Sequence, residues 1–341
     1  MRIVPMAVLV ACLTMGPLAA QPMPPPGPAQ TPASPASPGA GRGGRGGAPR
    51  VIHVPDAPTL PYVAVEHPLV VPPDVPLGVI ASVAVNSKGH IFLYQRMPVP
   101  LLEFDETGRF VRGLREGTQT RAHSIRIDAS DNIWLVDSAD ATVTKLSPQG
   151  DVLLTLGTKG VPGRGDAAAA RSVFNVPSDV AIASNGESFV SQDEGGGPDP
   201  RVIHFDARGQ FVNTWTLAYP DGTRSNPHSI EVDRAGLVYV ADREVMRIRV
   251  FRADGTPVRD VQMPTQMCGL FFDREGHLWA ATGFDGQVMR INLDGSVAGF
   301  TGKAGTGLGE MSEAHMLAVA PDGAVYVTDT VGKKIEKFVK R

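Results

Sequence analysis

Three histidines occupy the same position in a sequence pattern that recurs along the chain. His123, His228 and His315 each lie fourteen residues before an aspartate, and each begins a segment of apolar and β-branched residues interrupted by a turn. Zinc is commonly bound by imidazole nitrogens, and three of them leave a fourth position open for water or substrate. If the three segments meet at one point, the sequence predicts a three-histidine metal site with zinc as its simplest occupant.

Three further copies of the pattern lack the histidine. At the equivalent position they carry Ala81, Ser178 and Cys268. Histidine therefore occurs in every second copy, and a closed ring of six copies would bring the three imidazoles towards one axis. The competing interpretation is that the histidines are polar residues lining a wet channel, but their regular alternation favours the metal site.

The spacing of the copies predicts the fold. Their last residues are separated by 42, 55, 50, 40 and 47 positions. Each copy contains short strands joined by Asp-Gly-type turns, which are hairpin signals. A repeat of this length with three or four strands is typical of a β-propeller blade, so the sequence predicts an all-β, six-bladed propeller. The last copy ends before its outermost strand, and we expect residues 51–71 to supply that strand.

Composition limits the classes of partner. The chain has 341 residues, a formal charge of −3 and 42% hydrophobic residues. No strong positive field attracts it to nucleic acid or to a membrane surface, and the apolar content supports a large core. We expect a monomer that acts on a small-molecule or peptide-like substrate.

The N-terminal region has a different composition from the rest. Residues 1–20 combine a basic start with a short apolar run and read as an export signal. The segment around Cys12 also resembles a bacterial lipobox, so a plain signal and a lipoprotein signal ending at Cys12 stay open as alternatives. Residues 21–50 are rich in proline, alanine and glycine and predict a flexible linker before the propeller at 51–341. We therefore expect a periplasmic, secreted or lipid-anchored protein.

The copies resemble NHL repeats, and their combined motifs resemble the peptidyl-α-hydroxyglycine α-amidating lyases, which are six-bladed propellers. The resemblance covers about residues 75–341. It implies a zinc ion held by His123, His228 and His315, and it aligns the two active-site arginines of the family with Arg96 and Arg243. The implied activity is a carbon–nitrogen lyase that cleaves a carbinolamide.

Each of the two arginines follows the last residue of its copy, in copies 1 and 4 of the ring. Opposed guanidinium groups can hold a substrate carboxylate through paired hydrogen bonds. The alternative is a structural ion pair between blades. Both interpretations are consistent with the spacing, and the resemblance favours the substrate clamp.

Two positions depart from the family pattern. Glu194 stands where the family has a catalytic tyrosine; it is a candidate base if it is desolvated, and a solvated loop acid otherwise. Met316 stands where the family has an aspartate that helps to bind calcium, which puts calcium in doubt. The rival to the lyase is therefore a non-catalytic propeller that binds a protein or small ligand and has a purely structural metal.

Overall fold

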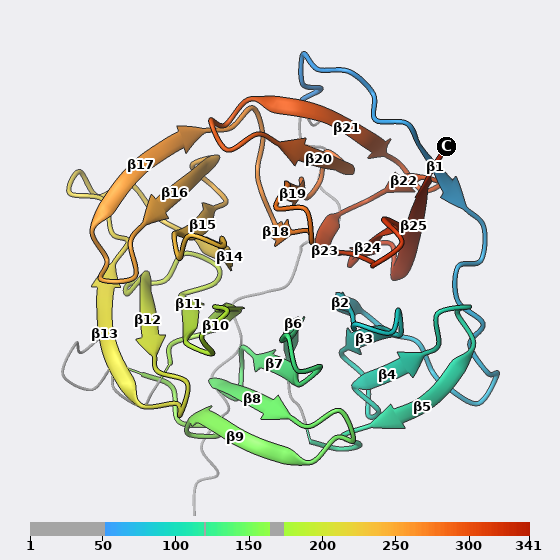
Figure 1. Cartoon of the computed structure of the whole chain (residues 1–341), viewed down its shortest axis with the longest axis horizontal. Coiled ribbons are helices and arrows are strands. Elements are labelled where there is room, and N and C mark those ends of the chain that lie inside the picture. Colours follow the sequence, from blue (N-terminus) through green and yellow to red (C-terminus); the bar gives the residue numbers. More distant parts are fainter. Residues whose placement is uncertain (1–51, 119–120, 164–173) are drawn as a thin grey trace, which may run out of the picture. The chain divides into compact units, whose positions relative to one another are not determined.

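The computed structural model describes residues 52–118, 121–163 and 174–341. Over these ranges the chain forms six β-sheets arranged as blades around a central axis (Figure 1). The predicted six-bladed propeller is confirmed. Within the same ranges there is no helix long and apolar enough to span a bilayer. The predicted export signal (1–20) and linker (21–50) lie outside the described residues.

The first three blades have four strands each, ordered from the axis outwards. They are β2 (Ile80–Val85), β3 (Ile91–Gln95), β4 (Leu101–Phe104) and β5 (Phe110–Leu114); β6 (Ala122–Ile127), β7 (Ile133–Asp137), β8 (Thr142–Leu146) and β9 (Val152–Gly157); and β10 (Pro177–Ile182), β11 (Ser188–Gln192), β12 (Arg201–Phe205) and β13 (Phe211–Thr216).

The last three blades follow the same plan, with one extra strand in blade 5 and a borrowed strand in blade 6. They are β14 (Pro227–Val232), β15 (Val238–Asp242), β16 (Arg247–Phe251) and β17 (Pro257–Gln262); β18 (Gly269–Phe272), β19 (Leu278–Ala281), β20 (Gln287–Ile291), β21 (Val297–Ala304) and β22 (Glu310–Met311); and β23 (Ala314–Val319), β24 (Val325–Asp329), β25 (Lys334–Lys340) and β1 (Tyr62–Val65).

The borrowed strand β1 closes the ring. It runs antiparallel to β25, with Tyr62 opposite Lys340 and Val65 opposite Lys337, and Figure 1 shows the blue strand beside the red C-terminal one. The Tyr62 ring also packs edge-on against Trp279 of blade 5, with the ring centroids 5.8 Å apart. The prediction that residues 51–71 complete the last blade is confirmed, and the pairing covers an edge that would otherwise be open.

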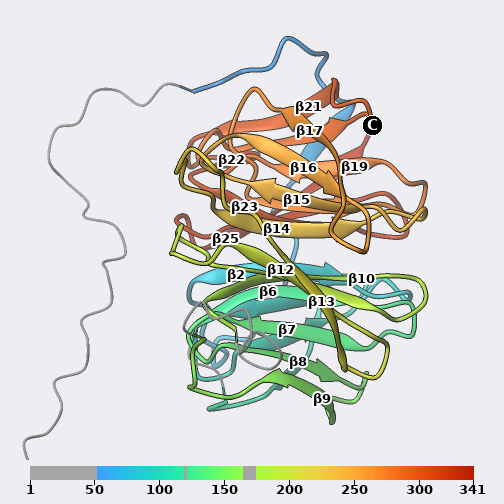
Figure 2. The same ribbon diagram turned by 90° about the vertical axis from the view of Figure 1, so that its left-hand side faces the viewer.

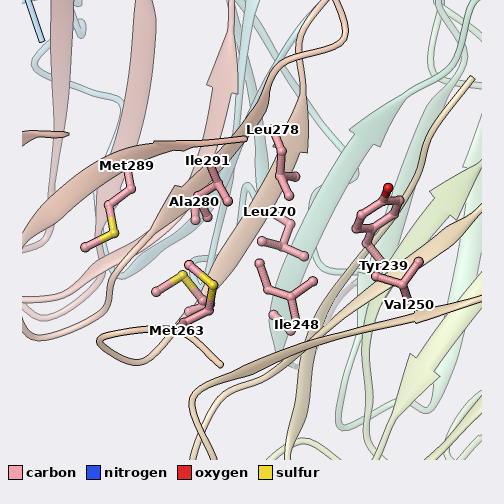
Figure 3. Close-up of a cluster of buried hydrophobic side chains, with 11 residues drawn as sticks. Tyr239, Ile248, Val250, Met263, Leu270, Leu278, Ala280, Met289 and Ile291 are labelled. Atoms are coloured by element: carbon pink, nitrogen blue, oxygen red, sulfur yellow. The ribbon is translucent and has the colours of Figure 1, made fainter. Parts of the chain in front are cut away.

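The core of the propeller lies between neighbouring blades. Six clusters of buried apolar side chains fill the six interfaces. Figure 3 shows the cluster between blades 4 and 5, where Tyr239 and Ile248 face Leu270, Leu278 and Met289. The second strand of each blade is buried along its whole length, which is why it reads as a nearly continuous apolar run in the sequence, whereas the outermost strands of blades 1 to 4 are largely half-buried or exposed.

The antiparallel register places the histidines and the loops that follow the second strands on one face of the ring. Turned by 90°, the blades are seen from the side, with their strands running between the two faces (Figure 2). Ala122 pairs with Asp137 and Pro227 pairs with Asp242, so the start of each inner strand lies beside the end of the second strand. The histidines, which follow these starts, and the loops that follow the second strands therefore lie on the same face.

Candidate metal centre and its surroundings

The structure brings the three predicted histidines together at the axis. Their ring centroids are 4.9 Å apart for His123 and His228, 5.2 Å for His123 and His315, and 4.9 Å for His228 and His315. One nitrogen from each ring lies within 4.8 Å of the others. All three side chains are buried. A single small ion can therefore be reached by all three imidazoles.

An interruption of each inner strand aims these side chains at the axis. The pairing of β6 with β7 steps from Ala122 to Ser124 and passes over His123. The pairing of β14 with β15 steps over His228 in the same way. A residue left out of the ladder by a bulge is re-aimed away from the sheet faces, and bulges of this kind are frequent beside functional sites.

The aspartate that ends each histidine-containing pattern fixes the start of the same inner strand. Asp242 Oδ1 accepts a hydrogen bond of 2.7 Å from the backbone N–H of Asn226, two residues before His228. The equivalent bond joins Asp329 Oδ1 to the N–H of Glu313, 2.9 Å away. This contact is the physical reason for the fixed spacing between histidine and aspartate, because the carboxylate locks the loop from which the histidine projects.

The Nδ1 atom of each histidine is engaged by the backbone of the next blade along the chain. The acceptors are the carbonyl oxygens of Ser178 for His123 (2.5 Å), Cys268 for His228 (2.7 Å) and Ala81 for His315 (2.7 Å). A carbonyl can only accept, so each Nδ1 carries the proton and each Nε2 presents its lone pair. This fixes the tautomer that metal-binding histidines require.

The electrostatic environment keeps the three rings neutral. Burial, followed by the neighbouring charge of Arg96, lowers the pKa of His123 to about 3. Burial and then His123 lower the pKa of His315 to about 3, and burial with Arg243 lowers that of His228 well below its usual range. Among the described residues, His123 Nε2 is buried and has no hydrogen-bond partner. A buried lone pair of this kind fits a metal ligand, so the donor set suits zinc.

Arg96 and Arg243 lie on the face of the histidines. Arg96 Nε donates to the carbonyl oxygen of Ala122 (3.1 Å), next to His123. Arg243 Nε and Nη2 donate to Glu244 Oε1 at 3.0 and 2.9 Å. The charge of each arginine lowers the pKa of at least one of the histidines. Each guanidinium therefore approaches the candidate metal centre from its own blade.

Glu194 is not the solvated loop acid that was one reading of the sequence. Its carboxylate is only 12% exposed and lies 3.1 Å from Arg121 Nη2. Its negative charge also acts on Arg96 and Arg243. The structure thus groups Glu194 with both predicted arginines and adds Arg121, which the sequence analysis missed.

The positions of Arg121 and Glu313 in the repeat could have identified them as residues near the site. Arg121 lies two residues before His123, and Glu313 lies two residues before His315, so both occupy the same position in the repeat. Both act electrostatically on Arg96. Both positions come just before the inner strands, on the face that carries the histidines, and Asn226 is the equivalent residue in blade 4.

Cys268 takes part in the candidate metal centre through its backbone carbonyl and not through its sulfur. The side chain is fully buried, and burial raises the pKa of the thiol to about 12. It is therefore a protonated, unreactive thiol at neutral pH. Its carbonyl oxygen is the acceptor for His228 described above.

A buried cation already lies below the histidines. Arg126 donates to the carbonyl oxygen of Leu270 (3.0 Å), to Glu231 Oε1 (2.6 Å) and to both oxygens of Asp179, and so reaches blades 3, 4 and 5 from blade 2. Met316 is a buried apolar side chain here. The aspartate of the calcium site that the resemblance implies is therefore absent.

Comparison with known proteins matches this architecture. Residues 225–251, which include His228 and Asp242, match the NHL repeat. A Caenorhabditis elegans protein named probable peptidyl-alpha-hydroxyglycine alpha-amidating lyase pgal-1 is 28% identical over 305 residues, covering 77% of this chain and 83% of that protein. Human NHL repeat-containing protein 3 is also 28% identical, over 293 residues, covering 77% of this chain and 80% of that protein.

Among solved structures, a streptogramin B lyase superposes with a TM-score of 0.60 at 15% identity, covering 82% of this chain and 98% of that one. At this identity the likeness concerns the fold alone. The sequence similarity to the amidating lyase covers most of both chains, 77% of this chain and 83% of that protein. The chain is a six-bladed β-propeller with an NHL repeat, and it is similar to the peptidyl-α-hydroxyglycine α-amidating lyases over about three quarters of its length.

Proposed function

We propose that the protein is a zinc-dependent carbon–nitrogen lyase that cleaves a carbinolamide bearing a carboxylate. The observation that carries the proposal is the convergence of three buried, neutral imidazoles with their Nδ1 protons held by backbone carbonyls. The similarity to amidating lyases supports the same reaction class. In this reaction the C–N bond breaks, the hydroxyl carbon becomes a carbonyl, and the nitrogen leaves as an amide after it takes up a proton.

The residues that would hold the zinc are His123, His228 and His315. Zinc bound there would act as a Lewis acid that acidifies the substrate hydroxyl. Arg96 and Arg243 would orient the substrate by binding its carboxylate from two blades, which places the hydroxyl carbon over the histidines. The hydroxyl proton needs an acceptor, and Glu313, an acidic residue near Arg96, would serve as one.

A second candidate function is a binding propeller without catalysis. It is favoured by the equal similarity to NHL repeat-containing protein 3, whose name refers to the repeat alone. In that case the metal would be structural and the channel mouth would bind a ligand. Both proposals concern a protein that functions after export and without nucleic acid as partner.

The test combines metal analysis with a turnover assay. The purified protein would be loaded with zinc and given an N-acyl-α-hydroxyglycine, and release of the aldehyde acid would be measured. The lyase predicts product from the zinc-loaded protein and none from His228→Ala. If the parent protein binds one zinc and releases no product, the lyase proposal is rejected in favour of the binding propeller.

A further inference from the structure

Glu194 is an acid placed inside a group of arginines. It follows β11 by two residues, at the mouth where the histidines lie. Its side chain is 12% exposed, and Oε2 lies 3.1 Å from Arg121 Nη2. A side chain this buried keeps its position even though the loop that carries it is rich in glycine.

An unusual backbone conformation is found both at the residue before Glu194 and at the residue that accepts the hydrogen bond of the Glu194 N–H. Val176 has a φ angle of +47° and Asp193 one of +81°. A positive φ is costly for any residue with a Cβ and rare for a β-branched one, so the surrounding structure must enforce it. Two hydrogen bonds help to enforce this conformation. The N–H of Glu194 donates to the carbonyl oxygen of Val176 (3.2 Å), and the N–H of Gly195 donates to Asn226 Oδ1 (3.1 Å).

The strained loop holds the Glu194 carboxylate among positively charged side chains. Besides its pair with Arg121, the Glu194 carboxylate acts on Arg96 and on Arg243. Burial and then the charge of Arg121 lower the pKa of Arg96, while Glu194 opposes this effect. The carboxylate therefore offsets part of the positive charge that a substrate carboxylate would meet.

We infer that Glu194, buried in its ion pair with Arg121, is a resident counter-ion that competes with the carboxylate of the substrate for the positive charge of Arg121, Arg96 and Arg243. The inference rests on the proposed function, because it assumes that these arginines bind a carboxylate. Glu194 is then a specificity residue rather than the base: it weakens carboxylate binding and favours release of the acid product. The affinity for a neutral ligand of the same shape does not depend on this competition.

Electrostatics sets the size of the effect. Two like charges at a partly exposed site repel by about 1.4 kcal/mol when the screening lies between that of bulk water and that of a protein surface, which corresponds to about a tenfold change in affinity. Removal of the Glu194 charge should therefore tighten the binding of a carboxylate by about tenfold at low ionic strength. The gain should shrink as salt is added, because exposed parts of the interaction are screened.

The experiment compares two ligands of nearly equal size, glycolate and its neutral amide, glycolamide. Binding of each to the zinc-loaded, full-length protein is measured by calorimetry for the parent protein and three variants. Glu194→Gln removes the charge and keeps the size, and Glu194→Asp keeps the charge. Glu106→Gln is the matched control, because Glu106 is 62% exposed in the turn between β4 and β5.

We expect Glu194→Gln to bind glycolate about tenfold more tightly than the parent while its glycolamide affinity changes less than twofold. Glu194→Asp and Glu106→Gln should resemble the parent. Unchanged or weaker glycolate binding by a folded Glu194→Gln protein would overturn the inference. A carbinolamide turnover in which Glu194→Gln lowers kcat about a hundredfold at constant KM would also overturn it, because that is the signature of a base.

Failure of the proposed function gives a different result. If the protein is not a lyase, no variant releases product, yet the two calorimetric titrations still report whether Glu194 competes with a carboxylate. If no protein binds glycolate, the arginines do not bind carboxylates and the inference is overturned together with that part of the proposed function.

Discussion

The Nδ1 atom of His228 donates a hydrogen bond of 2.7 Å to the backbone carbonyl oxygen of Cys268. The two residues occupy equivalent positions in neighbouring blades, and the same relation links His123 with Ser178 and His315 with Ala81. Blades without a histidine thus provide the acceptor that orients the histidine of the blade before. Because a backbone carbonyl serves, the side chain at that position is free to be alanine, serine or cysteine.

Metal binding provides the first prediction. Replacement of any one of the three histidines by alanine should lower zinc affinity by about a hundredfold or more, since two imidazoles make an incomplete site. Zinc per protein would be measured after dialysis against a competing chelator of known affinity. His67→Ala is the control, because that side chain is exposed and belongs to no cluster of potential metal ligands among the described residues. Equal zinc retention by His228→Ala and His67→Ala would refute the site.

The arginines provide the second prediction. Arg96→Ala and Arg243→Ala should each raise KM or lower kcat for a carboxylate substrate, so that kcat/KM falls about a hundredfold, because a charge-assisted contact to the substrate is lost. The melting temperature should change little, since neither guanidinium closes a buried ion network. Lysine at either position should restore little activity, because a point charge does not reproduce the planar fork. Two variants that unfold while activity per folded molecule persists would make the arginines structural.

The repeat predicted the parts of the site that depend on chain geometry alone. A strand period and a closed ring determine which residues face the axis, so the positions of His123, His228 and His315 follow from the alternation of the copies. The pairing of residues 62–65 with the last blade follows in the same way, since a missing outer strand must be supplied from elsewhere in the chain.

Other features could not be predicted from the repeat. The interruption of the strand ladder at the histidines recurs at the equivalent positions of blades 1 and 3, after Ile80 and after Pro177, but no residue type in the sequence marks it. The burial of Glu194 depends on Arg121, which lies 73 positions earlier in the chain. The role of Arg126 likewise depends on Asp179 and Glu231, which belong to other blades.

The interfaces between blades provide the third prediction. Leu270 is 1% exposed in the cluster between blades 4 and 5. Leu270→Ala should lower the free energy of unfolding by about 2–5 kcal/mol, because the deletion leaves a cavity between two rigid sheets. Leu293→Ala removes the same atoms from a side chain that is 47% exposed and should cost less than about 1 kcal/mol. Urea unfolding of the two variants measures the difference, and equal losses would contradict the assignment of the core.

The buried cluster below the histidines provides the last prediction. Arg126 contacts two carboxylates, Asp179 and Glu231, so the fully ionised cluster carries one excess negative charge. Burial, only partly offset by Arg126, raises the pKa of Glu231 from 4.5 to about 7. The folded state therefore binds the Glu231 proton more tightly than the unfolded state does. The stability that this proton contributes is fully present below pH 4.5 and is lost as the pH rises through 7.

Glu231→Gln keeps the size of the side chain and removes this titration. The free energy of unfolding of the parent should fall relative to that of the variant between pH 4.5 and 7, by on the order of 3 kcal/mol, with a constant difference above pH 7.5. Unfolding by urea at a series of pH values measures this difference, with Glu106→Gln as an exposed control. A parent and a Glu231→Gln variant with parallel pH profiles would show that folding does not raise the pKa of Glu231.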